Sequence, residues 1–486
     1  MSRIQKIKNW LLKNQTAAQT VAKNTVWLVA SQIMSRVLRA GLVIYAARVL
    51  GASSWGAFSY ALAIVTFLTT FSDFGVNAYL TKEVARDPNQ KDRSLSTALY
   101  IKLGLLFVLF IVIFLTRNYL TNISEARALI PILIFVFAFD ALRDFGSALM
   151  RAFERMEVEA LLTLLTNFAI VIFGFIFLAS SAAAQSLAYA YAAGSILGFI
   201  ATLVALRRHL RRIFSNFSAP LVKKIITSAW PFGLMTLLGV IMLNTDIIVI
   251  GWLRSAEAVG FYSAGQKITQ LLYVVPTLFA SALFPQFARV ASAGQEARFR
   301  LRLEKSLGLA LLIALPLALG GLLLGDQITD LFFGPAYHPA AAVFQILSLT
   351  FLIVFPSIIL SNALFARGER KEFVRAVTIG LATNLIANLI LIPPFGLPGA
   401  AAATIISQVA SNFFFWKKMK RALAFRLMPY LKTSLMAAPI MIIATVALRF
   451  GQVPVIANVT ASGLAYIGTL YLLKEPLIVE VKRLFK

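Results

Sequence analysis

Two arginines lie three residues apart in the middle of an apolar stretch near the start of the chain. Arg36 and Arg39 belong to a run of mainly hydrophobic residues at 25–47. Residues three apart share one face of a helix, so these guanidinium groups repel each other unless an anion or a carboxylate lies between them. Because the planar guanidinium donates two parallel hydrogen bonds, a phosphate or diphosphate suits such a pair. We therefore predict that Arg36, Arg39 and Lys267, which lies in another apolar stretch, bind an anionic substrate.

A second group of charged residues combines both signs. Asp140, Arg143 and Asp144 are spaced i, i+3 and i+4, which brings them to one side of a helix. Charged side chains in an apolar environment are costly and usually face a partner or a water-filled cavity. This cluster is either a secondary polar site or a structural ion pair that neutralises itself.

Three further charges lie closer to the ends of their apolar stretches. For Asp73 and Asp246 we predict gating or ion coupling, with packing as the alternative. Protons and sodium ions are both candidates for such coupling. For Lys102 we expect the ammonium group to extend to the membrane surface. We expect no cofactor and no metal site, because the chain has no cysteine and its two histidines lie in different loops.

The composition is typical of a membrane protein. Of the 486 residues, 59% are hydrophobic and only 14% are charged, whereas soluble domains have about 25% charged residues. Apolar runs of about twenty residues recur along the chain, and a helix of that length crosses a bilayer. We therefore expect an all-α polytopic membrane protein and exclude a soluble enzyme or a nucleic-acid-binding domain.

Charged and Pro- or Gly-rich breaks divide the chain into fourteen predicted transmembrane helices. They are 25–47, 55–80, 94–116, 127–151, 159–179, 184–206, 225–251, 256–287, 306–325, 341–366, 373–392, 398–416, 433–449 and 453–473. With the N-terminus in the cytoplasm, the cytoplasmic segments hold 35 of the 46 Lys and Arg residues and the outer connections hold 5. Because short cytoplasmic loops are enriched in positive charge, we expect a multi-pass protein of the cytoplasmic (inner) membrane with both termini cytoplasmic. The net charge of +26 is thus mainly a sign of topology, and no nucleic acid partner is expected.

Two stretches resemble each other at a spacing of 204 residues. This shift aligns Gly56 with Gly260 and Phe58 with Tyr262. It spans six predicted helices, an even number, so related helices run in the same direction, as in transporters built from parallel repeats. We therefore predict two six-helix lobes.

The predicted organisation has six parts. They are a cytoplasmic N-terminal segment at 1–24, an N-lobe at 25–206, a basic cytoplasmic linker at 207–224, a C-lobe at 225–416, two further helices with a preceding basic loop at 417–473, and a cytoplasmic tail at 474–486. In the N-terminal segment we expect an interfacial helix, one face of which is formed by Ile4, Ile7, Trp10 and Leu11.

Several short motifs follow one another along the chain. They are 50–58 (LGASSWGAF), 73–86 (DFGVNAYLTKEVAR), 260–267 (GFYSAGQK), 362–371 (NALFARGERK) and 392–401 (IPPFGLPGAA). Together and in this order they resemble the polysaccharide-biosynthesis flippase family, which includes O-antigen and lipid-linked oligosaccharide flippases. This family belongs to the multidrug/oligosaccharidyl-lipid/polysaccharide exporter superfamily.

The resemblance implies two six-helix lobes around a central cavity, with two additional C-terminal helices. Helices 1, 2, 7 and 8 line the cavity in this superfamily, which would place there Arg36, Arg39, Asp73, Asp246 and Lys267. It also implies a transporter rather than an enzyme, which moves polyprenyl-diphosphate-linked oligosaccharide repeat units to the outer leaflet by alternating access. The implied partners are this lipid-linked sugar, membrane lipids, a polysaccharide polymerase and glycosyltransferases.

Three alternatives remain at this stage. A lipid II (peptidoglycan precursor) flippase would use a similar anion-binding cavity. A multidrug or cation antiporter of the same superfamily fits less well, because cationic drugs prefer acidic cavities and Arg36 and Arg39 are basic. A membrane scaffold for glycosyltransferases would depend on the basic cytoplasmic loops and not on the intramembrane charges.

Overall fold

The computed structural model describes residues 17–86, 91–209 and 214–477, and within these ranges the chain forms helices and no strands. Four residues predicted to form one face of an interfacial helix lie outside the described residues; they are Ile4, Ile7, Trp10 and Leu11. The α-helices are α2 (Ala17–Thr69), α3 (Val76–Arg86), α4 (Lys91–Thr116), α5 (Ser124–Ala152), α6 (Met156–Ser180), α7 (Ala184–Leu206), α9 (Ala219–Leu253), α10 (Ala256–Leu272), α11 (Val274–Ser292), α12 (Glu296–Phe333), α13 (Ala340–Ser348), α14 (Phe351–Ala366), α15 (Arg370–Leu423), α16 (Met428–Phe450) and α17 (Val455–Leu472). Two short 3-10 turns, η1 (Thr70–Ser72) and η3 (Pro335–Tyr337), connect some of them.

Eleven of the fourteen predicted transmembrane segments coincide with one of these helices or with part of one, whereas 55–80, 256–287 and 341–366 each run across two helices. Among the described residues, ten helices are long and apolar enough to cross a membrane, and the pair α13 and α14, bent by 47°, makes an eleventh. The longest two, α2 and α15, are each broken by a non-helical glycine, Gly51 (φ 71°) and Gly396 (φ 61°), which divides each into two helical segments, as the sequence predicted. The helix α5, which carries Asp140, Arg143 and Asp144, is not among these ten. The predicted all-α polytopic fold is confirmed.

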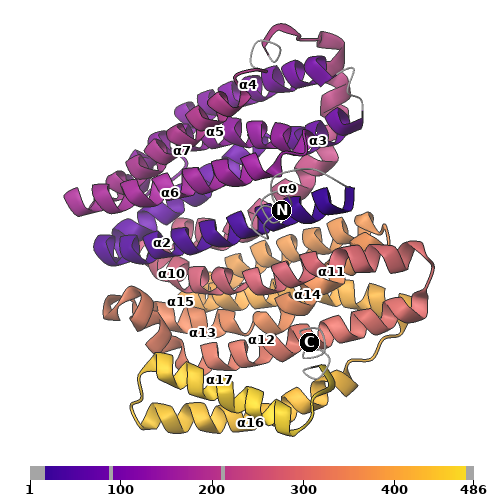
Figure 1. The fold of residues 1–486 in the computed structure, drawn as a ribbon. Coiled ribbons are helices and arrows are strands. Elements are labelled where there is room, and N and C mark those ends of the chain that lie inside the picture. The colour runs from indigo at the N-terminus through magenta and orange to yellow at the C-terminus, as the bar shows by residue number, and fades with distance from the viewer. Residues whose placement is uncertain (1–16, 87–90, 210–213, 478–486) are drawn as a thin grey trace, which may run out of the picture. The chain divides into compact units, whose positions relative to one another are not determined.

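The chain divides into two compact units, residues 1–260 and residues 261–486. In the first unit, α6 packs against α7 and α2, and α5 packs against α7 and α2; these helices lie roughly alongside one another in Figure 1. The long helix α9 packs against α2 and α3 in this unit, although the predicted C-lobe begins at residue 225. The predicted lobe boundaries stay a prediction.

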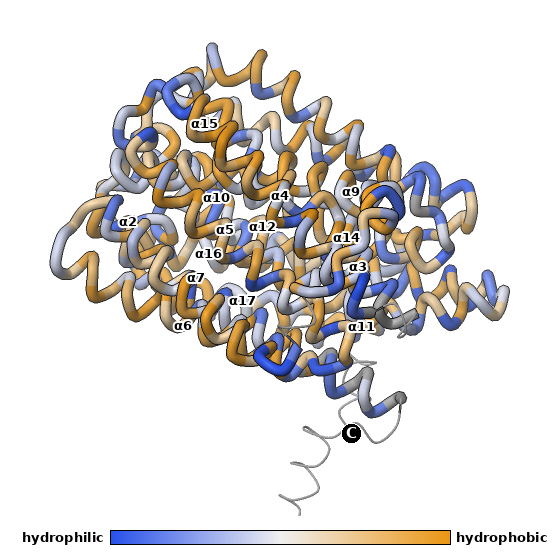
Figure 2. The backbone as a smooth tube through the Cα atoms, turned by 90° about the horizontal axis from the view of Figure 1, so that it is seen from above, coloured by the Kyte–Doolittle hydropathy of each residue, from blue (hydrophilic) through white to orange (hydrophobic). Residues whose placement is uncertain are grey.

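In the second unit, α12 is the central element. It packs against α13, α14 and α16, while α14 packs against α15 and α16 pairs with α17. Figure 2 shows long hydrophobic stretches along the helices of the chain, with hydrophilic residues concentrated at turns and helix ends. In the first unit, large apolar side chains such as Phe107 and Leu115 on α4 remain exposed, as expected for a surface that contacts lipid.

The two stretches related by the 204-residue shift contact each other. A Cβ atom added to Gly56 would lie 1.8 Å from the carbonyl oxygen of Ala256, and one added to Gly260 would lie 1.9 Å from that of Ala52. The two contacts are equivalent under the shift, because residue 56 corresponds to residue 260 and residue 52 to residue 256. Such reciprocity is what a two-fold relation between the repeats predicts, and only small residues permit so close an approach of two helices.

Candidate functional site

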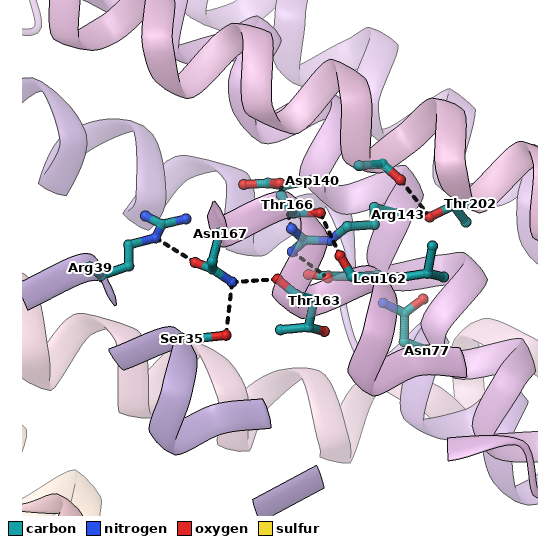
Figure 3. A network of polar contacts seen from close by, with 12 residues as sticks. Ser35, Arg39, Asn77, Asp140, Arg143, Leu162, Thr163, Thr166, Asn167 and Thr202 are labelled. Carbon is teal, nitrogen blue, oxygen red and sulfur yellow. Dashed lines mark hydrogen bonds and ion pairs between the residues drawn. The ribbon is translucent and has the colours of Figure 1, made fainter. Parts of the chain in front are cut away.

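The two arginines predicted to bind an anion have different surroundings. Arg39 is half-buried, and its Nε donates a hydrogen bond of 2.6 Å to Oδ1 of Asn167 on α6 (Figure 3). Its guanidinium carbon lies 4.8 Å from the centre of the Tyr191 ring on α7, a favourable cation–π geometry. Arg36 is exposed and has no hydrogen bond or ion pair to any residue that the structure describes.

Asn167 is the residue that the sequence reasoning missed. Its side chain is only 8% exposed, and its Nδ2 donates to Ser35 Oγ at 3.2 Å and to the carbonyl oxygen of Thr163 at 2.7 Å. Both ends of the amide are therefore engaged, with the oxygen directed to Arg39 (Figure 3). The available signal was a polar amide within the apolar run 159–179.

The mixed cluster on α5 forms two ion pairs. Arg143 lies 3.1 Å from Oδ1 of Asp140 and donates to Oδ1 of Asp144 at 2.9 Å. Arg143 and Asp140 are largely buried, whereas the Asp144 side chain is 55% exposed. Asp140 also attracts Arg39 electrostatically, so the cluster and the α2 arginine belong to one polar region inside the first unit (Figure 3).

Asp73 pairs with a cation other than the three predicted ones. Lys102 Nζ donates to Oδ1 of Asp73 at 2.9 Å and to Oδ1 of Asn77 at 3.2 Å. The Lys102 side chain is 1% exposed, so it does not extend to the surface as expected from the sequence. Its ammonium instead reaches two oxygen acceptors within the unit, which offset the cost of burying the charge.

A strained turn places Asp73 beside Lys102. Phe74 and Gly75 both have positive φ values, 38° and 84°, between η1 and α3. A Cβ atom on Gly75 would lie 2.2 Å from the carbonyl oxygen of Ala229, so the turn packs directly on the α9 backbone. The DFG motif found in the sequence is therefore a tight turn that needs glycine and presents the aspartate.

The remaining two predicted residues lie on other helices. Asp246 is 2% exposed on α9 of the first unit. Lys267 is half-buried on α10, in the part of that helix that belongs to the second unit. The grouping of Lys267 with Arg36 and Arg39, and the gating or ion-coupling role of Asp246, stay predictions.

A family model described as "Polysaccharide biosynthesis protein" matches residues 21–291, more than half of the chain. The protein belongs to this polysaccharide biosynthesis family. The membership confirms the resemblance drawn from the sequence motifs. A second family model, MatE, matches residues 231–390, in keeping with the superfamily.

Relatives in this family extend over most of the chain. The probable low-salt glycan biosynthesis flippase of Haloferax volcanii is 25% identical over 394 residues, which cover 80% of this chain and 81% of the relative. The putative O-antigen transporter of Shigella flexneri is 23% identical over 410 residues, 80% of this chain and 95% of the relative.

The solved structures of transporters share the fold. The lipid II flippase MurJ in its inward closed conformation matches with a TM-score of 0.79 and 18% identity, covering 93% of this chain and 99% of that chain. An inward-facing multidrug resistance transporter of the MATE family matches with a TM-score of 0.65 and 16% identity, covering 87% and 99%. The chain is thus a multi-pass membrane protein with a MurJ- and MATE-like fold.

Proposed function

We propose that this protein is a flippase that translocates polyprenyl-diphosphate-linked oligosaccharide repeat units across the cytoplasmic membrane by alternating access, for cell-surface polysaccharide biosynthesis. The observation that carries the proposal is Arg36, an exposed arginine in the middle of an apolar span whose charge no described residue neutralises. The family membership and the names of the two relatives as a glycan biosynthesis flippase and an O-antigen transporter support it.

The chemistry of the ligand follows from these charges. A diphosphate is an anion with several oxygen acceptors, and an arginine binds such oxygens with two parallel hydrogen bonds. A charged side chain at this depth is expected to face a water-filled cavity, in which the diphosphate and sugars are hydrated while the polyprenyl tail stays in lipid. Lys267 would add a further positive charge. The transport involves no covalent step, so the protein acts as a transporter and not as an enzyme.

The proposed cycle assigns different roles to the acidic residues. Asp73 is engaged by Lys102, which favours a structural role for that pair. Asp246 remains the candidate for gating or for coupling to protons or sodium ions. Any coupling acts only through different ion affinities of the inward and outward states. We place both termini in the cytoplasm because of the positive-inside bias, and a polysaccharide polymerase and glycosyltransferases are the proposed functional partners.

A lipid II flippase is the second candidate, because the MurJ fold covers 93% of this chain and the same anion site would serve both substrates. Proteoliposomes distinguish the two. Fluorescent polyprenyl-diphosphate oligosaccharide and fluorescent lipid II are placed in separate vesicles, and the loss of inner-leaflet label is timed with a membrane-impermeant quencher. We expect faster flipping of the oligosaccharide lipid. Equal or faster flipping of lipid II would favour the second candidate, and no flipping of either would contradict both.

A further inference from the structure

One buried side chain holds α2 on both sides of Arg36. Ser35 and Arg39 lie four residues apart and therefore on one face of the helix, and both are hydrogen-bonded to the Asn167 amide, at 3.2 Å and 2.6 Å. Arg36 lies between them in the sequence and makes neither contact. A single amide on α6 thus holds α2 at Ser35 and Arg39 (Figure 3), and Arg36 belongs to the same helical turn.

The position of this amide is itself determined by its surroundings. Asn167 is buried, and the Thr163 carbonyl oxygen accepts a hydrogen bond from its Nδ2 at 2.7 Å. The Tyr191 ring covers the Arg39 guanidinium. If α2 turned about its axis here, the hydrogen bonds of Asn167 to Ser35 and Arg39 would be lost together and only the one to Thr163 would remain, and buried polar groups without partners are unfavourable.

The two arginines also differ in how their charges are balanced. Arg39 is attracted by the Asp140 carboxylate, whereas Arg36 has no ion-pairing partner among the described residues. An arriving anion therefore has less competition for Arg36 than for Arg39. The Arg39 guanidinium would also have to leave Asn167 and Tyr191 in order to form a two-bond contact with a phosphate.

We propose that Arg36 is the cation that contacts the lipid-linked diphosphate, and that Asn167 is a positioning residue that directs Arg36 by holding α2 at Ser35 and Arg39. This inference rests on the proposed function for its ligand class. Arg36 and Arg39 thus have different roles, although the sequence alone predicts the same role for both. The role of Arg39 is mainly structural and electrostatic at longer range.

The test measures binding of a fluorescent polyprenyl diphosphate without sugar to the full-length protein in nanodiscs. We expect Arg36→Gln to weaken binding tenfold or more, and Arg39→Gln to weaken it less than Arg36→Gln does. Asn167→Ala should weaken binding about threefold, whereas Thr166→Val should leave it unchanged. Thr166 is the matched control, because it is buried next to Asn167 and its hydroxyl donates only within α6.

A double-mutant cycle separates positioning from a general structural effect. If Asn167 acts through Arg36, Asn167→Ala should change the affinity less than 1.5-fold in the Arg36→Gln background, where the polyprenyl tail still supports measurable binding. An equal loss in both backgrounds would contradict the positioning role. A larger loss for Arg39→Gln than for Arg36→Gln, or no binding by the natural protein, would contradict the diphosphate contact.

The absence of cysteine from the natural chain permits a second measurement. A protein with the single substitution Arg36→Cys should react with a water-soluble thiol reagent, because the position is expected to face water, and no reaction would contradict the inference. If Asn167→Ala does not fold, Asn167→Asp keeps an oxygen acceptor for Arg39 and for the Ser35 hydroxyl. In that background Arg36→Gln should still weaken binding tenfold, and a smaller loss would contradict the inference.

Failure of the proposed function gives a different pattern. These measurements use neither a sugar nor translocation, so a protein that binds the probe through Arg36 but flips no oligosaccharide lipid would contradict the flippase proposal alone. Normal flipping by Arg36→Gln would contradict this inference alone.

Discussion

Removal of Asp73 should destabilise the first unit strongly, because it leaves a buried ammonium group with one polar partner. Lys102 is 1% exposed and bonds to Asp73 at 2.9 Å and to Asn77 at 3.2 Å. Breaking a buried ion pair from one side costs about 3–5 kcal/mol. The Asp73 side chain is 27% exposed, so Lys102→Met leaves a carboxylate that water still reaches, and the expected cost is smaller, about 1–3 kcal/mol.

A double variant tests whether the unpaired buried charge causes this loss of stability. Asp73→Ala combined with Lys102→Met removes both charges, so it should be more stable than Asp73→Ala alone despite carrying one more substitution. The assay is thermal unfolding of the detergent-solubilised protein, followed by tryptophan fluorescence. For a unit of this size 1 kcal/mol corresponds to roughly 2–4 °C, so Asp73→Ala should lower the apparent Tm by about 6 °C or more. The reasoning is refuted if the double variant melts below Asp73→Ala.

The same variants separate a structural from a gating role of Asp73. If the pair is structural, the double variant should flip the oligosaccharide lipid at a rate close to that of the natural protein. Normal stability with lost flipping would instead restore the gating role predicted from the sequence.

Two further predictions concern packing and the α5 cluster. Gly56→Val should destabilise the protein by at least about 1–3 kcal/mol, because its Cβ would lie 1.8 Å from a backbone oxygen. The control Gly41→Ala should be neutral or slightly stabilising, because a Cβ there has nothing within 4 Å. Equal melting temperatures of the two variants would show that the helices separate freely. Arg143→Met should cost about 3–5 kcal/mol of stability, because it leaves Asp140 buried without its ion-pair partner. Asp144→Asn should cost less than about 1 kcal/mol, because the Asp144 side chain is exposed. If thermal unfolding showed the reverse order, the assigned burial would be contradicted.

The helices themselves could be predicted from the sequence, because a span of about twenty apolar residues is a direct consequence of bilayer thickness. The two breaks inside α2 and α15 were also predictable. Gly51 and Gly396 lie in the short gaps between predicted spans, and both adopt positive φ values that glycine permits.

The partners of the intramembrane charges could not be predicted in the same way. The spacing of Arg36 and Arg39 placed them on one side of a helix, but the difference between them depends on Asn167 and Tyr191, more than 120 residues away. Similarly, the burial of Lys102 depends on the turn at Phe74 and Gly75. Such contacts between distant segments follow from tertiary packing, which no local pattern records.

The cation-dependent transport of a lipid diphosphate is tested most directly by flipping in proteoliposomes with the double variant Arg36→Ala and Arg39→Ala. The matched control is Arg298→Ala, because Arg298 is an exposed arginine on the N-terminal turns of α12. We predict that the double variant loses most of the translocation of a fluorescent polyprenyl-diphosphate oligosaccharide, while the control retains it at equal protein density. Translocation by the double variant at the rate of the natural protein would contradict the account.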